Sequence, residues 1–297
     1  MTAVLPPRRR PPSVAAATAL GAALALGACG GSSAGEASGP GGALTVVASP
    51  PALLDLLHQV GGEQVHATGP APAGADAHAL ELSSEQVAAL VDADLVVHVA
   101  GLAPSVDEAV SLRDGATVDA MDLPGARPQD PHVWLDPAIM AVAAGEIAEA
   151  LAELDPEGRD QYVARGEDVG QQVHVLDDDL AEQLAPCRGA VLVVAHEAFG
   201  YLADRYGLQQ VGITGIDPGV EPTPARLRDV AEQVRTAGAE TIYFDDVTST
   251  GVAQTLAQEV GASTAVLDPL ETSVDPDYAT AMRQNGQTLR EGLVCDA

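Results

Sequence analysis

Lysine is missing from this chain of 297 residues, and all of its basic residues are arginines. The 14 arginines are outnumbered by 43 acidic residues, which gives a formal net charge of −29. Nucleic-acid binding needs clustered positive charge, so this composition argues against a nucleic acid as partner. We expect the acidic surface to keep the protein soluble and to attract cations weakly.

The N-terminal apolar run is too short for a transmembrane helix. It extends from Val14 to Leu26 after three arginines, which suits the central part of a secretory signal peptide. The next residues, up to Cys29, resemble the lipobox of bacterial lipoproteins, in which the cysteine is acylated. We therefore expect residues 1–28 to be a lipoprotein signal peptide and residues 29–43 a flexible Gly/Ser tether. Acylated Cys29 would hold the protein on the extracytoplasmic face of the cell membrane.

Cysteine is scarce, and no closely spaced metal motif is present. The sequence contains neither a CxxC pair nor an HExxH motif, although both are common in zinc sites. The two cysteines outside the N-terminal segment, Cys187 and Cys295, could form a disulfide in an oxidising compartment. Such a bridge would close a loop of about 100 residues and stabilise the fold by roughly 4 to 5 kcal/mol.

Short β-branched runs alternate with helical patterns from Leu44 onward, which is typical of an α/β fold with parallel sheets and flanking helices. The length suffices for two domains. We predict an N-terminal lobe (44–154) and a C-terminal lobe (186–297), joined by one long connecting helix over residues 155–185 that starts at Asp155-Pro156. The expected strands are 44–49, 65–69, 94–100, 190–195, 208–214, 240–245 and 263–268, and the other helices are 51–60, 84–92, 137–154, 197–206, 224–237, 250–260 and 276–292.

The segment DPHVWLDP, residues 130–137, places a histidine, His132, directly after a proline. Pro131 fixes its own φ and pushes the preceding residue toward an extended conformation, so the ring of His132 has a restricted direction. Asp136 and Pro137 are typical of a helix N-cap followed by proline at the first helical position. A loop therefore ends here and a helix begins.

Three histidines and one aspartate each follow a strand or an extended segment. In α/β folds ligands bind beyond the carboxyl ends of the strands, where these side chains are expected to lie. Three imidazoles and one carboxylate suit Zn²⁺, although each histidine alone could be an ordinary polar loop residue. The candidate metal ligands are His78, His132, His196 and Asp268. The other histidines are expected at surface or hydrogen-bonded positions: His58, His66, His98 and His174.

Four motifs together resemble the metal-binding substrate-binding lipoproteins of zinc and manganese ABC transporters, the cluster A-I type. These motifs are DPHVWLDP, HEAFGYLADRYGL (196–208), GVEPTPARL (219–227) and QTLAQEVGA followed by LDPLE (254–271). The resemblance implies two α/β lobes joined by one long helix, with a metal ion between them. It also implies His132, His196 and Asp268 as ligands. The loop GADAHALELSS keeps His78 but lacks the prolines of the family pattern.

The resemblance favours zinc, because manganese-preferring members place a carboxylate where this chain has His196 and imidazole suits Zn²⁺ better than Mn²⁺. Zinc-uptake members often carry a histidine-rich loop before DPH. The corresponding segment here, MDLPGARPQ, contains no histidine. Nearby acids should balance the charge and orient the rings. The candidates for this role are Glu81, Asp217, Glu221 and Asp245, and Asp245 is also a reserve fourth ligand.

The resemblance implies a monomeric binding protein, not an enzyme, that captures Zn²⁺ outside the cytoplasm and delivers it to an ABC import permease. Three alternatives stay open from the sequence. The cargo could be Mn²⁺ or Fe²⁺. The site could belong to a zinc-dependent hydrolase with Asp245 or Glu197 as general base. The protein could also be a metal-binding surface adhesin.

Overall fold

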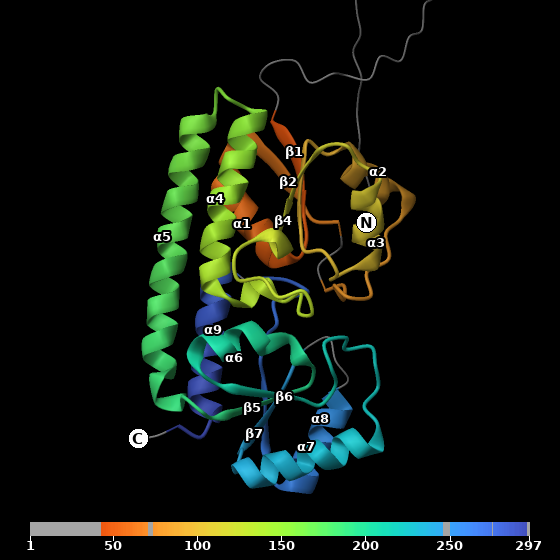
Figure 1. Ribbon diagram of the computed structural model, residues 1–297, viewed down its shortest axis with the longest axis vertical. Coiled ribbons are helices and arrows are strands. Elements are labelled where there is room, and N and C mark those ends of the chain that lie inside the picture. The colour runs from red at the N-terminus through yellow and green to blue at the C-terminus, as the bar shows by residue number, and fades with distance from the viewer. Residues whose placement is uncertain (1–42, 71–73, 246–249, 275, 296–297) are drawn as a thin grey trace, which may run out of the picture. The chain divides into compact units, whose positions relative to one another are not determined.

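Two parallel four-stranded sheets organise the computed structural model, which describes residues 43–70, 74–245, 250–274 and 276–295 (Figure 1). The expected signal peptide, Cys29 and the tether up to residue 42 lie outside the described residues. Within the described part of the chain, no helix is long and apolar enough to cross a membrane.

The two sheets have the same strand order relative to the chain. The first sheet has the order β2-β1-β3-β4, and the second has the order β6-β5-β7-β8, with every neighbouring pair parallel. The first strand of each half therefore lies inside its sheet. The strands are β1 (Leu44–Ala48), β2 (Val65–Thr68), β3 (Leu95–His98), β4 (Ala116–Asp119), β5 (Val191–Val194), β6 (Gln209–Gly212), β7 (Thr241–Phe244) and β8 (Ser263–Val266).

Helices cover both faces of each sheet, as the continuous apolar strands require. Alternate residues on one strand reach different cores: Val46 packs in the large core, whereas Val47 packs against a smaller cluster on the opposite face. The large core continues through both lobes. The helices are α1 (Pro51–Gly61), α2 (Ser84–Asp92), α3 (Pro104–Ser111), α4 (Pro137–Leu154), α5 (Arg159–Leu184), α6 (Gly200–Tyr206), α7 (Pro224–Ala237), α8 (Thr250–Val260) and α9 (Tyr278–Gly292).

The long helix α5 packs beside α4 and links the lobes, and α9 packs against it from the C-terminal half (Figure 1). The N-terminus of α9 also contacts the first lobe, since the backbone N–H of Tyr278 donates to Asp55 on α1 at 3.0 Å. Helix α9 therefore adds a contact between the halves beside the connecting helix α5.

The predicted fold class, two parallel α/β lobes joined by a long helix, is confirmed. Asp136 also caps α4 as expected, accepting from Ala138 N at 2.9 Å. The start of the connecting helix was misplaced. It begins at Arg159, because Asp155 closes α4 and accepts a hydrogen bond from Tyr162 Oη at 3.0 Å. Helix α3 and edge strand β4 were not predicted.

Candidate metal site

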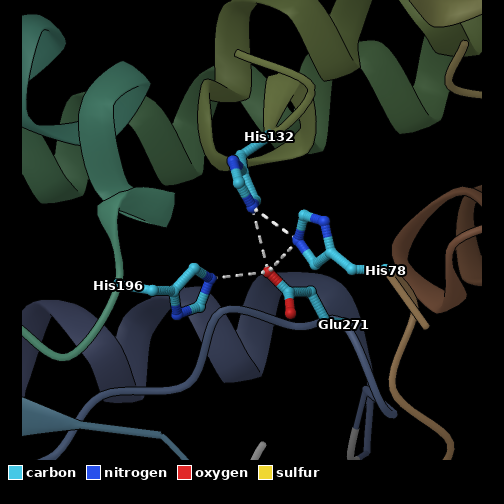
Figure 2. A group of neighbouring side chains, drawn as sticks. All are labelled: His78, His132, His196 and Glu271. Carbon is cyan, nitrogen blue, oxygen red and sulfur yellow. Dashed lines mark hydrogen bonds and ion pairs between the residues drawn. The ribbon is translucent and has the colours of Figure 1, made fainter. Parts of the chain in front are cut away.

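Three imidazoles and one carboxylate meet between the halves of the described structure (Figure 2). His78 and His132 come from the N-terminal half, and His196 and Glu271 come from the C-terminal half. The Oε1 atom of Glu271 lies 3.1 Å from Nε2 of His132, 3.2 Å from Nε2 of His196 and 3.6 Å from Nε2 of His78. One potential ligand atom from each residue lies within 4.8 Å of all the others.

These separations fit a tetrahedral zinc site. Zinc takes nitrogen and oxygen ligands at about 2.0–2.2 Å, so the ligand atoms of a tetrahedron lie about 3.3 to 3.6 Å apart. The second oxygen of Glu271, Oε2, is buried and has no hydrogen-bond partner among the described residues. A buried carboxylate oxygen without a donor is costly, and a cation beside this carboxylate would remove the cost.

His132 is fully buried, and the residues around it fix its ring. Asp130 accepts from the backbone N–H of His132 at 3.1 Å and lies 2.8 Å from its Nδ1 through the same oxygen. This contact leaves Nε2 to face the cluster. A carboxylate on the far nitrogen sets the ring orientation of a ligand histidine and makes the imidazole a stronger donor to metal.

His196 is held in an equivalent way from the second sheet. It follows β5, and its Nδ1 lies 2.9 Å from Oδ2 of Asp245, which follows the neighbouring strand β7. The structure thus places Asp245, one of the predicted orienting acids, behind His196. Both the ring and its carboxylate lie at the carboxyl ends of parallel strands, where α/β folds bind ligands.

His78 lies on a loop that is fixed by hydrogen bonds instead of prolines. Asp76 accepts from the backbone N–H of His78 at 2.9 Å, and the N–H of Gly74 donates to the carbonyl of Thr272 at 3.1 Å. The side chain of His78 is 10% exposed, whereas those of the other three residues of the cluster are fully buried. His78 is therefore the member of the cluster closest to solvent.

The carboxylate in the cluster belongs to Glu271, which corrects the expectation of Asp268. Oδ1 of Asp268 accepts from the N–H of Leu270 at 2.7 Å, so this side chain supports the turn that follows it. Leu270 is buried with φ of +60°, a conformation that is rare for a bulky residue. This turn presents Glu271 to the three imidazoles. Strain of this kind is often found at functional sites.

Trp134 connects the two segments that carry these ligands. Its indole N–H donates to the carbonyl of Pro269 at 2.7 Å, two residues before Glu271, and its ring packs edge-on against His132. The indole is fully buried. Trp134 is therefore a core residue that also fixes the DPHVWLDP segment against the turn before Glu271.

The buried cluster shifts the pKa values of its members. Burial lowers the pKa of His196, but hydrogen bonds with Asp245 and Glu271 outweigh burial and raise the pKa to about 9. Burial also lowers the pKa of His132, but its hydrogen bonds with Asp130 and Glu271 outweigh burial, so the pKa of His132 is raised. Burial raises the pKa of Glu271, but the three histidines hold it well below its ordinary value. A divalent cation entering the cluster therefore displaces protons from imidazoles.

The remaining predicted residues lie outside the cluster. Glu81, Asp217 and Glu221 are exposed, and no contact with the four clustered residues was found for them among the described residues. Asp130, which orients His132, was not proposed for this role, although it opens the DPHVWLDP motif. The histidines expected elsewhere do lie elsewhere: His58, His66 and His174 are exposed, and His98 is buried.

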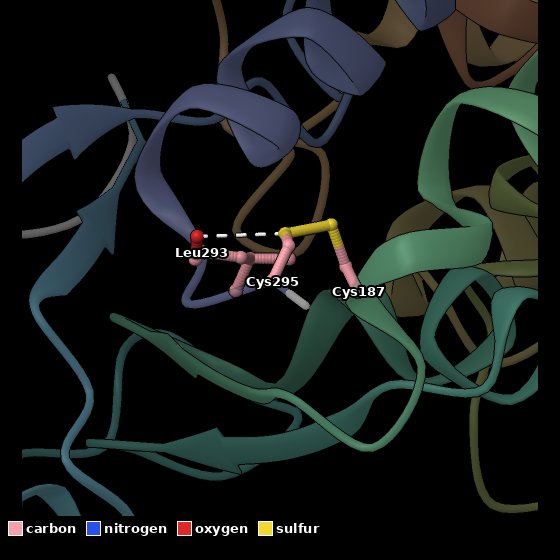
Figure 3. Close-up of a disulfide and its surroundings, with 3 residues drawn as sticks. All are labelled: Cys187, Leu293 and Cys295. Carbon is pink, nitrogen blue, oxygen red and sulfur yellow. Dashed lines mark hydrogen bonds between the residues drawn. A yellow bond between two sulfur atoms is a disulfide. The ribbon is translucent and has the colours of Figure 1, made fainter. Parts of the chain in front are cut away.

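Cys187 and Cys295 form a disulfide in the structure, with their Cα atoms 4.1 Å apart (Figure 3). The bond joins the turn after α5 to the segment after α9. Cys295 Sγ also contacts the carbonyl of Leu293 at 3.4 Å. The bridge therefore connects the C-terminal ends of α5 and α9.

The fold and the cluster define a two-lobed α/β binding protein with a candidate metal site between the lobes. Residues 46–292 match the family model described as zinc-uptake complex component A, periplasmic, ZnuA. The chain belongs to this family of solute-binding transport proteins. The resemblance inferred from the sequence motifs is thereby confirmed.

Known relatives agree with this assignment. The zinc-binding lipoprotein AdcA of Streptococcus pneumoniae is 30% identical over 279 residues, which cover 84% of this chain and 56% of AdcA. The chain thus spans about half the length of that relative. The high-affinity zinc uptake system protein ZnuA of Bacillus subtilis is 28% identical, with 91% of this chain and 94% of that protein covered. The zinc-bound ZnuA-like domain of S. pneumoniae AdcA superposes with a TM-score of 0.72 at 30% identity, covering 84% of this chain and 99% of that domain.

Proposed function

We propose that this protein is an extracytoplasmic substrate-binding protein that captures Zn²⁺ between its lobes and delivers it to an ABC import permease. The observation that carries this proposal is the cluster itself. Three imidazole Nε2 atoms and one carboxylate oxygen, drawn from both halves of the chain, converge at distances that fit one tetrahedral ion. The names of relatives as zinc-binding and zinc-uptake proteins support the same cargo.

The donor set favours zinc over manganese. Three imidazoles and a single carboxylate form a nitrogen-rich site, whereas Mn²⁺ prefers carboxylate, carbonyl and water oxygens in higher coordination. Two of the three rings are also held by aspartates at their Nδ1 atoms, which strengthens imidazole as a ligand.

The geometry supports capture rather than hydrolysis. A catalytic zinc normally keeps one open position for water, whereas this cluster offers four protein groups. The two residues considered as general bases are occupied elsewhere. Asp245 lies on Nδ1 of His196, on the side of the ring away from the cluster, and Glu197 pairs with Arg226 at 3.0 Å.

We also infer that the protein is tethered to the membrane through acylated Cys29. Support comes from the lipobox-like sequence before Cys29 and from the description of AdcA as a lipoprotein. Labelling of expressing cells with a fatty-acid analogue tests the tether. Wild type should incorporate the label and Cys29→Ser should not. Equal labelling of the two would refute acylation at this cysteine.

Competition titration tests the choice of metal. Protein purified without added metal is analysed for its elements and then titrated with Zn²⁺ and Mn²⁺ against a chromophoric chelator. We expect one zinc per chain and tighter binding of Zn²⁺ than of Mn²⁺. Preferential binding of Mn²⁺, or no stoichiometric binding of either ion, would refute the proposal.

A further inference from the structure

Asp130, the carboxylate behind His132, is shared between two partners. Its Oδ1 lies 2.8 Å from Nδ1 of His132, while its Oδ2 lies 2.8 Å from Nη2 of Arg127. Asp130 is buried, so its charge is balanced mainly by these neighbours. The position of the Arg127 guanidinium therefore affects the contact between Asp130 and the ring of His132.

Arg127 is held in turn by the second half of the molecule. Its guanidinium stacks on the ring of Tyr201, with Cζ 3.8 Å from the ring centroid, and its Nη1 pairs with Asp204. Both partners lie on α6, the short helix that follows His196. The orientation of His132 thus depends on Arg127, and Arg127 is anchored on α6, the helix that follows His196.

Tyr201 fixes both ends of the turn that presents Asp130. Its Oη accepts from the backbone N–H of Arg127 at 2.6 Å and donates to the carbonyl of Asp130 at 3.0 Å. The turn is also closed by the N–H of Asp130, which donates to the carbonyl of Arg127 at 3.0 Å. The hydroxyl is therefore a clamp on the backbone, independent of the ion pair.

Gly200 gives a separate indication that this contact is tightly fitted. A Cβ atom added at residue 200 would lie 2.7 Å from Oδ2 of Asp130 and 3.1 Å from Nη2 of Arg127. The first distance is shorter than any normal carbon contact, so a side chain here would displace the carboxylate. The start of α6 approaches the Asp130–Arg127 pair closely enough to require glycine.

We propose that Arg127 and Tyr201 are positioning residues that act through Asp130 to set how firmly His132 holds the metal ion. The inference rests on the proposed metal site. Because the clamp spans the two halves, any movement that separates α6 from the turn at residues 127–130 would weaken the Asp130–His132 contact. Separation of α6 from this turn, rather than loss of other contacts between the halves, would then favour release of the ion.

Metal dissociation rates and Co²⁺ spectra test this role. Wild-type protein, Arg127→Gln, Arg127→Lys and Tyr201→Phe are loaded with Zn²⁺, and release to excess chelator is followed by stopped flow. We expect Arg127→Gln to release zinc about 10- to 100-fold faster, the range typical of lost orienting contacts. Arg127→Lys should lie between wild type and Arg127→Gln, since it keeps the charge without the planar fork.

The absorption spectrum of bound Co²⁺ reports ligand geometry, which a loss of stability alone does not change. We expect the visible bands to shift in Arg127→Gln and Tyr201→Phe. Arg205→Gln is the matched control. Arg205 also bridges the halves, pairing with Asp136 at 3.2 Å and with Asp177, but it does not touch Asp130. Its replacement should leave the Co²⁺ spectrum and zinc release unchanged even if the melting temperature falls.

The outcomes separate this inference from the proposed function. If wild-type protein binds neither Zn²⁺ nor Co²⁺, the metal site itself is refuted. If wild type binds both ions but the Arg127 and Tyr201 variants match its release rate and spectrum, only the positioning role is refuted. Tyr201→Phe keeps the test decisive if Arg127→Gln does not fold, because it removes one hydroxyl and leaves the ion pair in place.

Discussion

The two halves of the molecule position their buried histidines with different structural elements. Each half supplies two residues of the cluster. One is a buried histidine whose Nδ1 contacts an aspartate, and the other comes from a loop. In the N-terminal half the aspartate, Asp130, is two residues from His132, so the pair belongs to one short motif. In the C-terminal half Asp245 comes from the neighbouring strand, 49 residues from His196. The first pair depends on local sequence, and the second depends on the sheet.

The other cluster residue of each half, His78 or Glu271, is also held in place in a different way. His78 lies on a loop that Asp76 and a bond to Thr272 hold in place. Glu271 depends on the left-handed conformation of Leu270, which directs it to the imidazoles. The N-terminal half supplies nitrogen alone, and the C-terminal half supplies the only negative charge within the cluster. Substitutions in the two halves therefore test whether they contribute equally to binding.

The largest effect is expected from loss of a buried imidazole. We predict that His132→Ala and His196→Ala each lower zinc affinity by roughly two orders of magnitude or more, because structural zinc sites bind with about 10–16 kcal/mol through four ligands. Competition titration measures the loss. His174→Ala, on the exposed face of α5, is the control and should bind as wild type does. Wild-type affinity in either cluster variant would contradict the assignment.

Replacement of the Glu271 carboxylate should lower zinc affinity nearly as much. A comparison with Asp268 shows which of these two acids of the LDPLE motif is the ligand. Glu271→Gln keeps the shape but removes the negative charge, and we expect zinc affinity to fall about 100-fold, as loss of one of four ligands implies. Asp268→Asn retains an oxygen that can accept from Leu270 N and should change affinity little. The opposite ranking in the same titration would show that Asp268 is the ligand.

A smaller effect is predicted for the two orienting aspartates. Asp130→Asn and Asp245→Asn should each weaken zinc binding about 10- to 100-fold, because the rings lose the carboxylates that orient them. Isothermal titration with a competing chelator measures both. If only one variant is affected, the two halves are not equivalent. If neither is affected, these aspartates do not support the site.

The smallest effect, taken over a single pH unit, is a pH dependence of stability and zinc affinity. The folded pKa of His196 is about 9, against an ordinary value of 6.5, so its protonation stabilises the metal-free fold fully below pH 6.5 and this contribution is lost as pH rises through 9. Zinc affinity should move the opposite way, increasing by up to about tenfold per pH unit for each displaced proton. Melting curves and titrations between pH 6.5 and 9 measure the two trends. Zinc affinity that stays constant over this range would contradict the raised pKa.

The sequence predicted the parts of the site that have local signals. His132 was found from DPHVWLDP, and His196 and the α/β alternation from strand patterns and motif resemblance. The choice between Asp268 and Glu271 was not accessible, because no sequence signal indicates that a leucine adopts a positive φ. The hydrogen bond of Tyr201 to the turn at Asp130 joins residues 71 positions apart and likewise needs the packed structure.

The account depends most on one claim, that four side chains from both halves hold a single cation. A crystal structure of protein loaded with Zn²⁺, with anomalous scattering recorded at the zinc edge, tests this claim directly. The account predicts one strong peak within about 2.0 to 2.2 Å of Nε2 of His78, His132 and His196 and of a carboxylate oxygen of Glu271. A peak at other residues, or the absence of a peak between the lobes of the loaded protein, would contradict it.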